Sequence, residues 1–116
     1  MAIIGSGGIV QDILNNFVAE LELKPSTSKQ LRLHFEKKYG KEMDNYSAYK
    51  SAMKVLIPVL VIQDKNDEEV AVKAGINIHK HLKNGKLFQT GDQGHSKVLA
   101  NSTVIKKVVQ FTKANN

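Results

Sequence analysis

The sequence predicts an α/β domain built around a short parallel sheet. Three apolar segments have the length and composition of buried strands, and they span residues 2–4, 57–62 and 86–90. Segments with apolar residues at helical spacing separate them, and both connections are long enough for a crossover. We therefore expect a three-layer fold, with about three parallel strands and helices on both faces. At 116 residues the chain is assigned to one domain, residues 1–116.

Composition argues against several classes of protein. Cysteine is absent, which removes disulfides and a cysteine nucleophile, and the four histidines are too scattered for a metal motif, so no metal or cofactor is expected. No apolar run approaches a membrane span, and no basic region precedes the apolar N-terminal residues, so we expect a cytoplasmic protein without a membrane partner. The net charge of +6 is spread along the chain without interleaved aromatic residues, which argues against nucleic acid as a partner.

A glycine-rich turn follows the first predicted strand. Gly5-Ser6-Gly7-Gly8 precedes a helical pattern in which Ile9, Ile13, Phe17 and Leu21 form one apolar stripe. Val10 stands where a dinucleotide-binding fingerprint has its third small residue, and the Gly-Lys-Ser/Thr of a P-loop is missing. We interpret the segment as a strand-to-helix turn. Nucleotide or anion binding by its backbone N–H groups is the alternative.

The sequence pattern of residues 24–55 predicts two further helices. Pro25 ends the first helical pattern, and Gly40 is a natural end for a helix over residues 29–39. A second helix is expected over residues 46–54. Two helices between consecutive strands are more than a crossover needs.

Polar residues follow the second and third predicted strands. Asp67 comes after the strand 57–62, and His95 comes after the strand 86–90. Because parallel strands end at the same edge of a sheet, we expect these two side chains to emerge together there. Asp64 and Asp92 are competing carboxylates, and the run Asp67-Glu68-Glu69 would also suit the start of the helix expected over residues 70–82.

This pattern resembles the second half of an α/β-hydrolase. Asp67-Glu68-Glu69-Val70 matches the family's D-x-x-V acid turn, and Gly94-His95 matches its G-H turn. The resemblance implies half of an α/β-hydrolase fold, with Asp67 and His95 as the acid and the histidine of a catalytic triad. It also implies an esterase-type enzyme that acts on a small-molecule ester or acyl substrate, with residues 24–55 as a lid-like insertion.

The third member of a triad is missing from the sequence. The nucleophile elbow G-x-S-x-G occurs nowhere, Ser6 is preceded two residues earlier by Ile4 rather than by glycine, and Ser96 is adjacent to His95 and therefore too constrained. We expect this chain to be inactive by itself. The first strand would also leave an open sheet edge, which predicts either a missing preceding segment or self-association. The alternative function is thus a non-enzymatic α/β module that dimerises or binds a partner through that edge.

Overall fold

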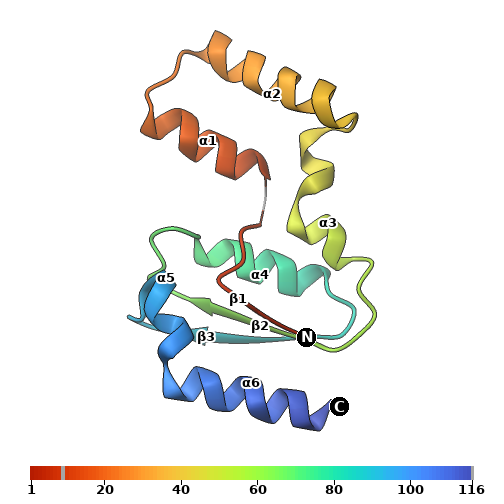
Figure 1. The fold of residues 1–116 in the computed structure, drawn as a ribbon, viewed down its shortest axis with the longest axis vertical. Helices are drawn as coiled ribbons and strands as arrows, with labels where there is room; N and C mark the ends of the chain where they lie inside the picture. The colour runs from red at the N-terminus through yellow and green to blue at the C-terminus, as the bar shows by residue number, and fades with distance from the viewer. Residues whose placement is uncertain (9, 116) are drawn as a thin grey trace.

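The computed structural model describes residues 1–8 and 10–115, and it contains a parallel sheet of three strands (Figure 1). Their order is β1 (Ala2–Ile4), β2 (Val59–Asp64) and β3 (Gly85–Thr90), which confirms the predicted parallel sheet. The helices are α1 (Val10–Glu20), α2 (Pro25–Tyr39), α3 (Ala48–Ala52), α4 (Val72–His81), α5 (Gly94–Lys97) and α6 (Ser102–Ala114). Two 3₁₀ turns, η1 (Met43–Tyr46) and η2 (Val98–Ala100), complete the described elements.

Strand β2 lies two residues later than the sequence predicts. Hydrophobicity placed it at 57–62, but the strand begins at Val59, after Pro58, and continues through Gln63 and Asp64. Those two polar residues pair in register with Gln89 and Thr90 of β3, so ladder pairing carries the strand beyond its apolar part. All six residues of β2 are buried, as expected for the central strand.

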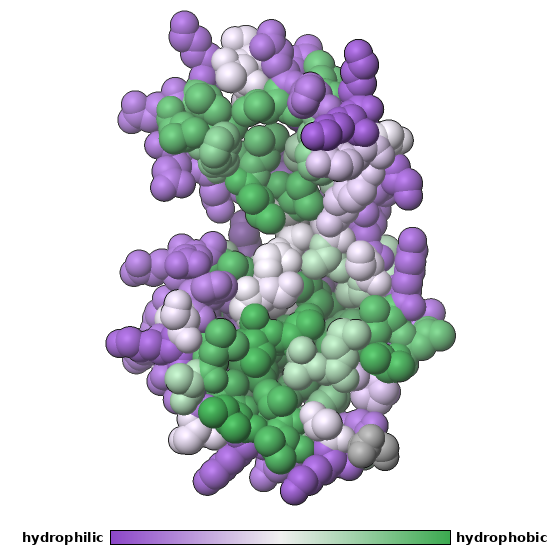
Figure 2. Space-filling view, viewed as in Figure 1, coloured by the Kyte–Doolittle hydropathy of each residue, from purple (hydrophilic) through white to green (hydrophobic). Residues whose placement is uncertain are grey.

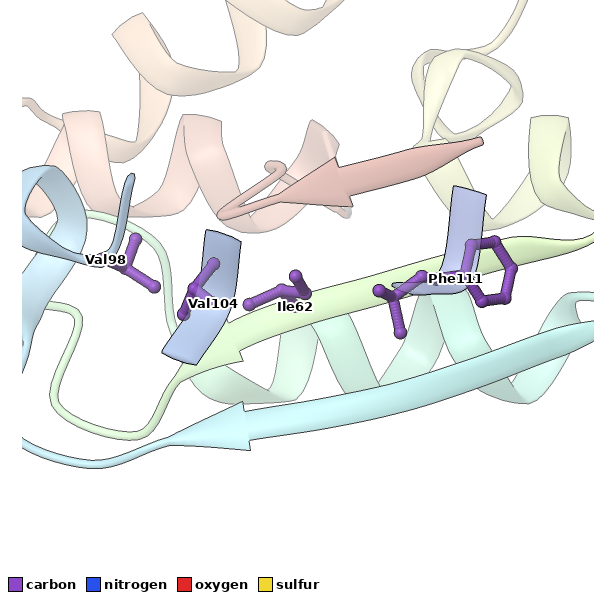
Figure 3. Packing of buried hydrophobic residues seen from close by; sticks show 5 residues of the cluster. Ile62, Val98, Val104 and Phe111 are labelled. Carbon is purple, nitrogen blue, oxygen red and sulfur yellow. The ribbon is translucent and has the colours of Figure 1, made fainter. Parts of the chain in front are cut away.

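Alternating side chains of β2 build a core on each face of the sheet. Leu60 and Ile62 pack with Val98, Val104 and Phe111 on the face covered by α6 (Figure 3). On the opposite face, Val59 and Val61 pack with Ala52 of α3 and Ile78 of α4. The sheet is therefore covered on both faces, as the fold class requires.

The predicted helix with an apolar stripe is present as α1, and the stripe is largely exposed. Ile13 is 56% exposed, and Phe17 and Leu21 are also about half exposed, so these side chains are not part of a core. The reason is the position of α1, which forms a hairpin with α2 on the far side of α4 and α3 from the sheet (Figure 1). Figure 2 shows the resulting apolar surface on this hairpin. Ile9, the first residue of the predicted stripe, lies outside the described residues.

The segment 24–55 contains the expected helices with shifted bounds. Pro25 occupies the first turn of α2, because a residue there needs no backbone donor, and Gly40 ends the helix with a φ of 75°. The predicted helix 46–54 is replaced by η1 and the shorter α3. A lid function for this segment stays a prediction.

Candidate active site at the carboxyl end of the sheet

Two loops meet where β2 and β3 end. Asp64 and Thr90, the last residues of these strands, are directly paired, so the segments that follow them start side by side. Asp67 lies in the loop after β2, and His95 lies in the short helix α5 after β3 (Figure 1). The structure thus brings together the two residues that the sequence singled out, across 28 positions of the chain.

The Asp67 carboxylate and the His95 imidazole form a direct hydrogen bond. Nδ1 of His95 lies 2.8 Å from Oδ2 of Asp67, whose side chain is only 1% exposed. The other oxygen, Oδ1, accepts the backbone N–H groups of Glu69 at 2.9 Å and Val70 at 2.8 Å. Because an ionised carboxylate only accepts, Nδ1 carries the proton, and Nε2 is the free nitrogen of the neutral ring.

The contact shifts the pKa of both groups in opposite directions. Burial by itself would raise the pKa of Asp67, but hydrogen bonds from Val70, His95 and Glu69 outweigh it and hold the pKa below its ordinary value of 3.8. The hydrogen bond to Asp67 raises the pKa of His95 above 6.5, against a smaller opposing effect of burial. The pair therefore favours an anionic carboxylate beside a histidine that readily accepts a proton.

His95 lines an open cavity of about 400 Å³, together with Glu69, which lies on the Nε2 side of the ring. Glu69 is the nearest acidic group, with Oε2 at 3.5 Å from Nε2, but its side chain is 70% exposed and therefore well solvated. Asn66, Glu68, Asp92 and Ser96 also line this cavity. Since Asp67 engages Nδ1, Nε2 is the ring nitrogen left to exchange a proton with a reacting group.

The competing carboxylates do not contact His95. Asp64 is buried and bonds to the backbone of both loops, and Asp92 accepts a hydrogen bond from the Asn66 side chain. The Ser6 hydroxyl donates to the carbonyl of Gly7 at 3.3 Å and not to His95.

The alternative interpretation placed the acidic run Asp67-Glu68-Glu69 at the start of helix α4, and the structure does not show this. The helix begins at Val72, its N-cap is Ala71, and its first turn contains no acidic residue. Asp67 instead closes its own loop through the two backbone bonds at Oδ1. The same geometry that shapes this loop also aims Oδ2 at the imidazole.

Two neighbours of the pair were missed from the sequence. Gly5 has a φ of +60°, and a Cβ there would lie 3.3 Å from Cε1 and Nδ1 of His95, so glycine is needed for the close approach. Gln63 is buried and donates from Nε2 to Oδ2 of Asp67 at 3.3 Å and to the carbonyl of Val70 at 3.0 Å. The glycine-rich turn after β1 is the sequence signal that could have indicated Gly5. Gln63 gives no such signal, because in the sequence it reads as the first residue of a polar loop.

Neither a metal-ligand cluster nor a membrane-spanning helix is found among the residues that the structure describes. Over residues 1–8 and 10–115, no group of three or more potential ligand side chains comes together to hold a metal ion. Nε2 of His79 lies near the carbonyl of Gly85, and Nδ1 of His81 lies near the carbonyl of Asn77. Within the same ranges no helix combines the length and apolar character needed to cross a membrane.

A comparison with known protein families shows which family the chain belongs to. The family model described as TAP-like protein, a group of α/β-hydrolases, matches residues 37–113. The chain belongs to this α/β-hydrolase family. The matched region includes β2, β3 and both members of the Asp67–His95 pair. A search of curated proteins finds no significant match.

Solved structures show that the chain corresponds to part of this fold. Rv0554 from Mycobacterium tuberculosis is similar over 99% of this chain and 56% of its own, with a TM-score of 0.67 and 16% identity. BpoC from Mycobacterium tuberculosis H37Rv is similar over 99% of this chain and 57% of its own, with a TM-score of 0.65 and 12% identity. The α/β-hydrolase MGS-MChE2, from a sediment metagenome of the Mar Chica lagoon in Morocco, is similar over 97% and 49%, with a TM-score of 0.60 and 16% identity. The chain therefore spans about half the length of these structures.

Proposed function

We propose that this chain is the C-terminal portion of an esterase-type serine hydrolase, in which Asp67 and His95 are the acid and the histidine of the triad. The observation that carries the proposal is the 2.8 Å contact between Asp67 Oδ2 and His95 Nδ1 at the carboxyl end of a parallel sheet. Both residues lie in the region that matches the α/β-hydrolase family. The substrate class is a small ester or a related acyl compound.

In this reaction His95 acts through Nε2. The nitrogen accepts the proton of a serine hydroxyl as its oxygen attacks the carbonyl carbon, and it later returns that proton to the leaving alcohol as the C–O bond breaks. Asp67 keeps the proton of the neutral ring on Nδ1 and stabilises the imidazolium that forms. A second cycle with water as the attacking group releases the acid and frees the serine.

The nucleophile and the oxyanion donors come from a segment that precedes this chain in the fold. No G-x-S-x-G is present among the 116 residues, and the family's triad follows the order serine, acid, histidine. Strand β1 pairs only with β2 among the described residues, so its other edge is free to accept a further strand. By itself the chain lacks the groups that supply most of the catalytic stabilisation, and we expect it to be inactive.

A serine-reactive phosphonate tests both parts of the proposal. We expect no labelling of this chain by itself, and stoichiometric labelling would contradict the missing nucleophile. We also expect the coding region upstream of Met1 to contain a G-x-S-x-G segment. The joined protein should be labelled at that serine, and His95→Ala should reduce the labelling rate by two orders of magnitude or more.

His81→Ala is the matched control for His95→Ala. His81 lies on α4 and bonds to the carbonyl of Asn77, away from the Asp67–His95 pair, so its loss should leave the labelling rate unchanged. Equal labelling of both variants and the parent would remove His95 from the mechanism.

The open edge of β1 supports a second candidate, a non-enzymatic module that associates through this strand. Ile105 and Val109 of α6 add apolar side chains that are about half exposed. Light scattering after size exclusion tests this candidate: a dimer at micromolar concentration would support it, and a monomer at all concentrations would contradict it.

A further inference from the structure

A buried carboxylate that does not touch His95 connects the two loops of the site. Asp64 is the last residue of β2 and is 1% exposed. Its four hydrogen-bond donors come from the end of β3, from the β2 loop and from the start of α5. We propose that Asp64 is a positioning residue that holds His95 in bonding distance of Asp67. This role presupposes the proposed function of that pair.

Each oxygen of Asp64 accepts two hydrogen bonds. Oδ1 accepts the hydroxyl of Thr90 at 2.5 Å and the backbone N–H of Gln93 at 3.1 Å. Oδ2 accepts the backbone N–H groups of Gly94 at 2.9 Å and Asn66 at 3.0 Å. Four donors are about the number that a carboxylate can accept, so its bonding capacity is filled by protein groups.

The anchored backbone positions are the immediate neighbours of the pair. Asn66 precedes Asp67, and Gly94 precedes His95, so one carboxylate fixes the residue before each member. Gly94 has a φ of +77°, which turns the chain directly into α5. Because Oδ2 of Asp64 bonds to both positions, a shift of either loop relative to the other would break one of these bonds.

Ionisation of Asp64 is what allows this arrangement. Burial would raise the pKa of its carboxyl group, but the bonds from Thr90, Gly94, Gln93 and Asn66 together lower the pKa below 3.8. A neutral group of the same shape cannot accept all four donors. In Asp64→Asn one oxygen becomes an NH₂ group, which would face backbone N–H donors instead of accepting from them.

The test measures the pKa of His95 by NMR titration of its ring protons in Asp64→Asn. We expect the pKa to fall from its raised value toward 6.5, because the imidazole loses its fixed distance to Asp67. Asp67→Asn is the reference for complete loss of the contact and should lower the pKa at least as far. Thr90→Val removes one donor but keeps the three backbone bonds, so it should leave the pKa close to that of the parent.

A general loss of stability must be separated from this local effect. Asn101→Ala removes the side chain that caps α6, after η2 in the chain, and should destabilise the fold without changing the pKa of His95. If Asp64→Asn leaves the His95 pKa unchanged while Asp67→Asn lowers it, Asp64 has no positioning role and the proposed pair stands. If Asp67→Asn also has no effect, the proposed pair itself fails.

Hydrogen exchange in the parent protein keeps the proposal testable even if Asp64→Asn does not fold. The backbone amides of Asn66, Gln93 and Gly94 should exchange at least tenfold more slowly than the amide of Gly91 in the same region, because they donate to a buried carboxylate. Exchange of all three at the rate of Gly91 would overturn the inference.

Discussion

Replacing Asp67 by asparagine separates the electrostatic role of this side chain from its shape. The asparagine Oδ1 can still accept the backbone N–H groups of Glu69 and Val70, so the loop should keep its form. Its NH₂ group replaces Oδ2 and can no longer accept from His95 or from Gln63. We therefore expect a folded protein in which the pKa of His95 drops toward 6.5.

The loss of folding stability expected for Asp67→Asn comes from Gln63, the buried hydrogen-bond partner of Asp67. Gln63 is 1% exposed and loses one of two acceptors for its NH₂ group, while its bond to the Val70 carbonyl remains. An unsatisfied buried donor costs about 1–3 kcal/mol, and the retained bond places this case near 1 kcal/mol. The loss should be larger at pH 5 than at pH 8, because only the protonated imidazole gains charge attraction from Asp67.

Denaturant unfolding at the two pH values and an NMR titration of His95 measure these effects. Asp92→Asn is the control, since the Asp92 carboxylate accepts a hydrogen bond from the Asn66 side chain and not from His95. An Asp67→Asn protein with the parent's His95 pKa and an equal loss of stability at both pH values would refute the reasoning, whatever its total stability.

Three further predictions concern the same loops and the last helix. Gly5→Ala should cost about 1–2 kcal/mol and displace His95, because φ is +60° and the new Cβ would contact the ring, whereas Gly91→Ala, which enters open space, should unfold like the parent. Asn101→Ala should cost about 1 kcal/mol in thermal unfolding through loss of the 3.1 Å cap to Val104, and Asn101→Ser should retain most of it. The lowered pKa values of Asp64 and Asp67 stabilise the fold above pH 3.8, and this contribution is lost as the pH falls through their folded pKa values. The raised pKa of His95 stabilises the fold below pH 6.5, and this contribution is lost as the pH rises through its folded pKa. Unfolding free energies measured from pH 2 to pH 9 should show both changes, and a flat profile would contradict the site's hydrogen bonding.

Sequence alone could predict the sheet and the meeting of Asp67 with His95, because both follow from strand order. Parallel strands joined by crossovers end at one edge, so residues placed just after successive strands become neighbours. The bounds of β2 were less predictable, since Gln63 and Asp64 extend the strand by pairing with β3 rather than by being apolar. Short local helices such as α5 carry no periodic signal and were missed.

Tertiary placement explains the remaining differences. The apolar residues Ile13, Phe17 and Leu21 follow a helical period, but a period does not say whether an element is present to cover them. The roles of Gly5 and Gln63 depend on distances between segments that are far apart in sequence, 90 positions in the case of Gly5 and His95. Such contacts leave no local pattern in the sequence, and only the folded chain brings Gly5 and Gln63 next to the Asp67–His95 pair.

The tautomer of the neutral His95 ring is the most direct test of the Asp67–His95 contact. Long-range ¹H–¹⁵N NMR spectra recorded above the titration of His95 distinguish a proton on Nδ1 from a proton on Nε2. The 2.8 Å bond to Asp67 predicts the proton on Nδ1, with Nε2 unprotonated. A ring with its proton on Nε2 would show that Asp67 does not hold the imidazole, and the proposed triad pair would be wrong.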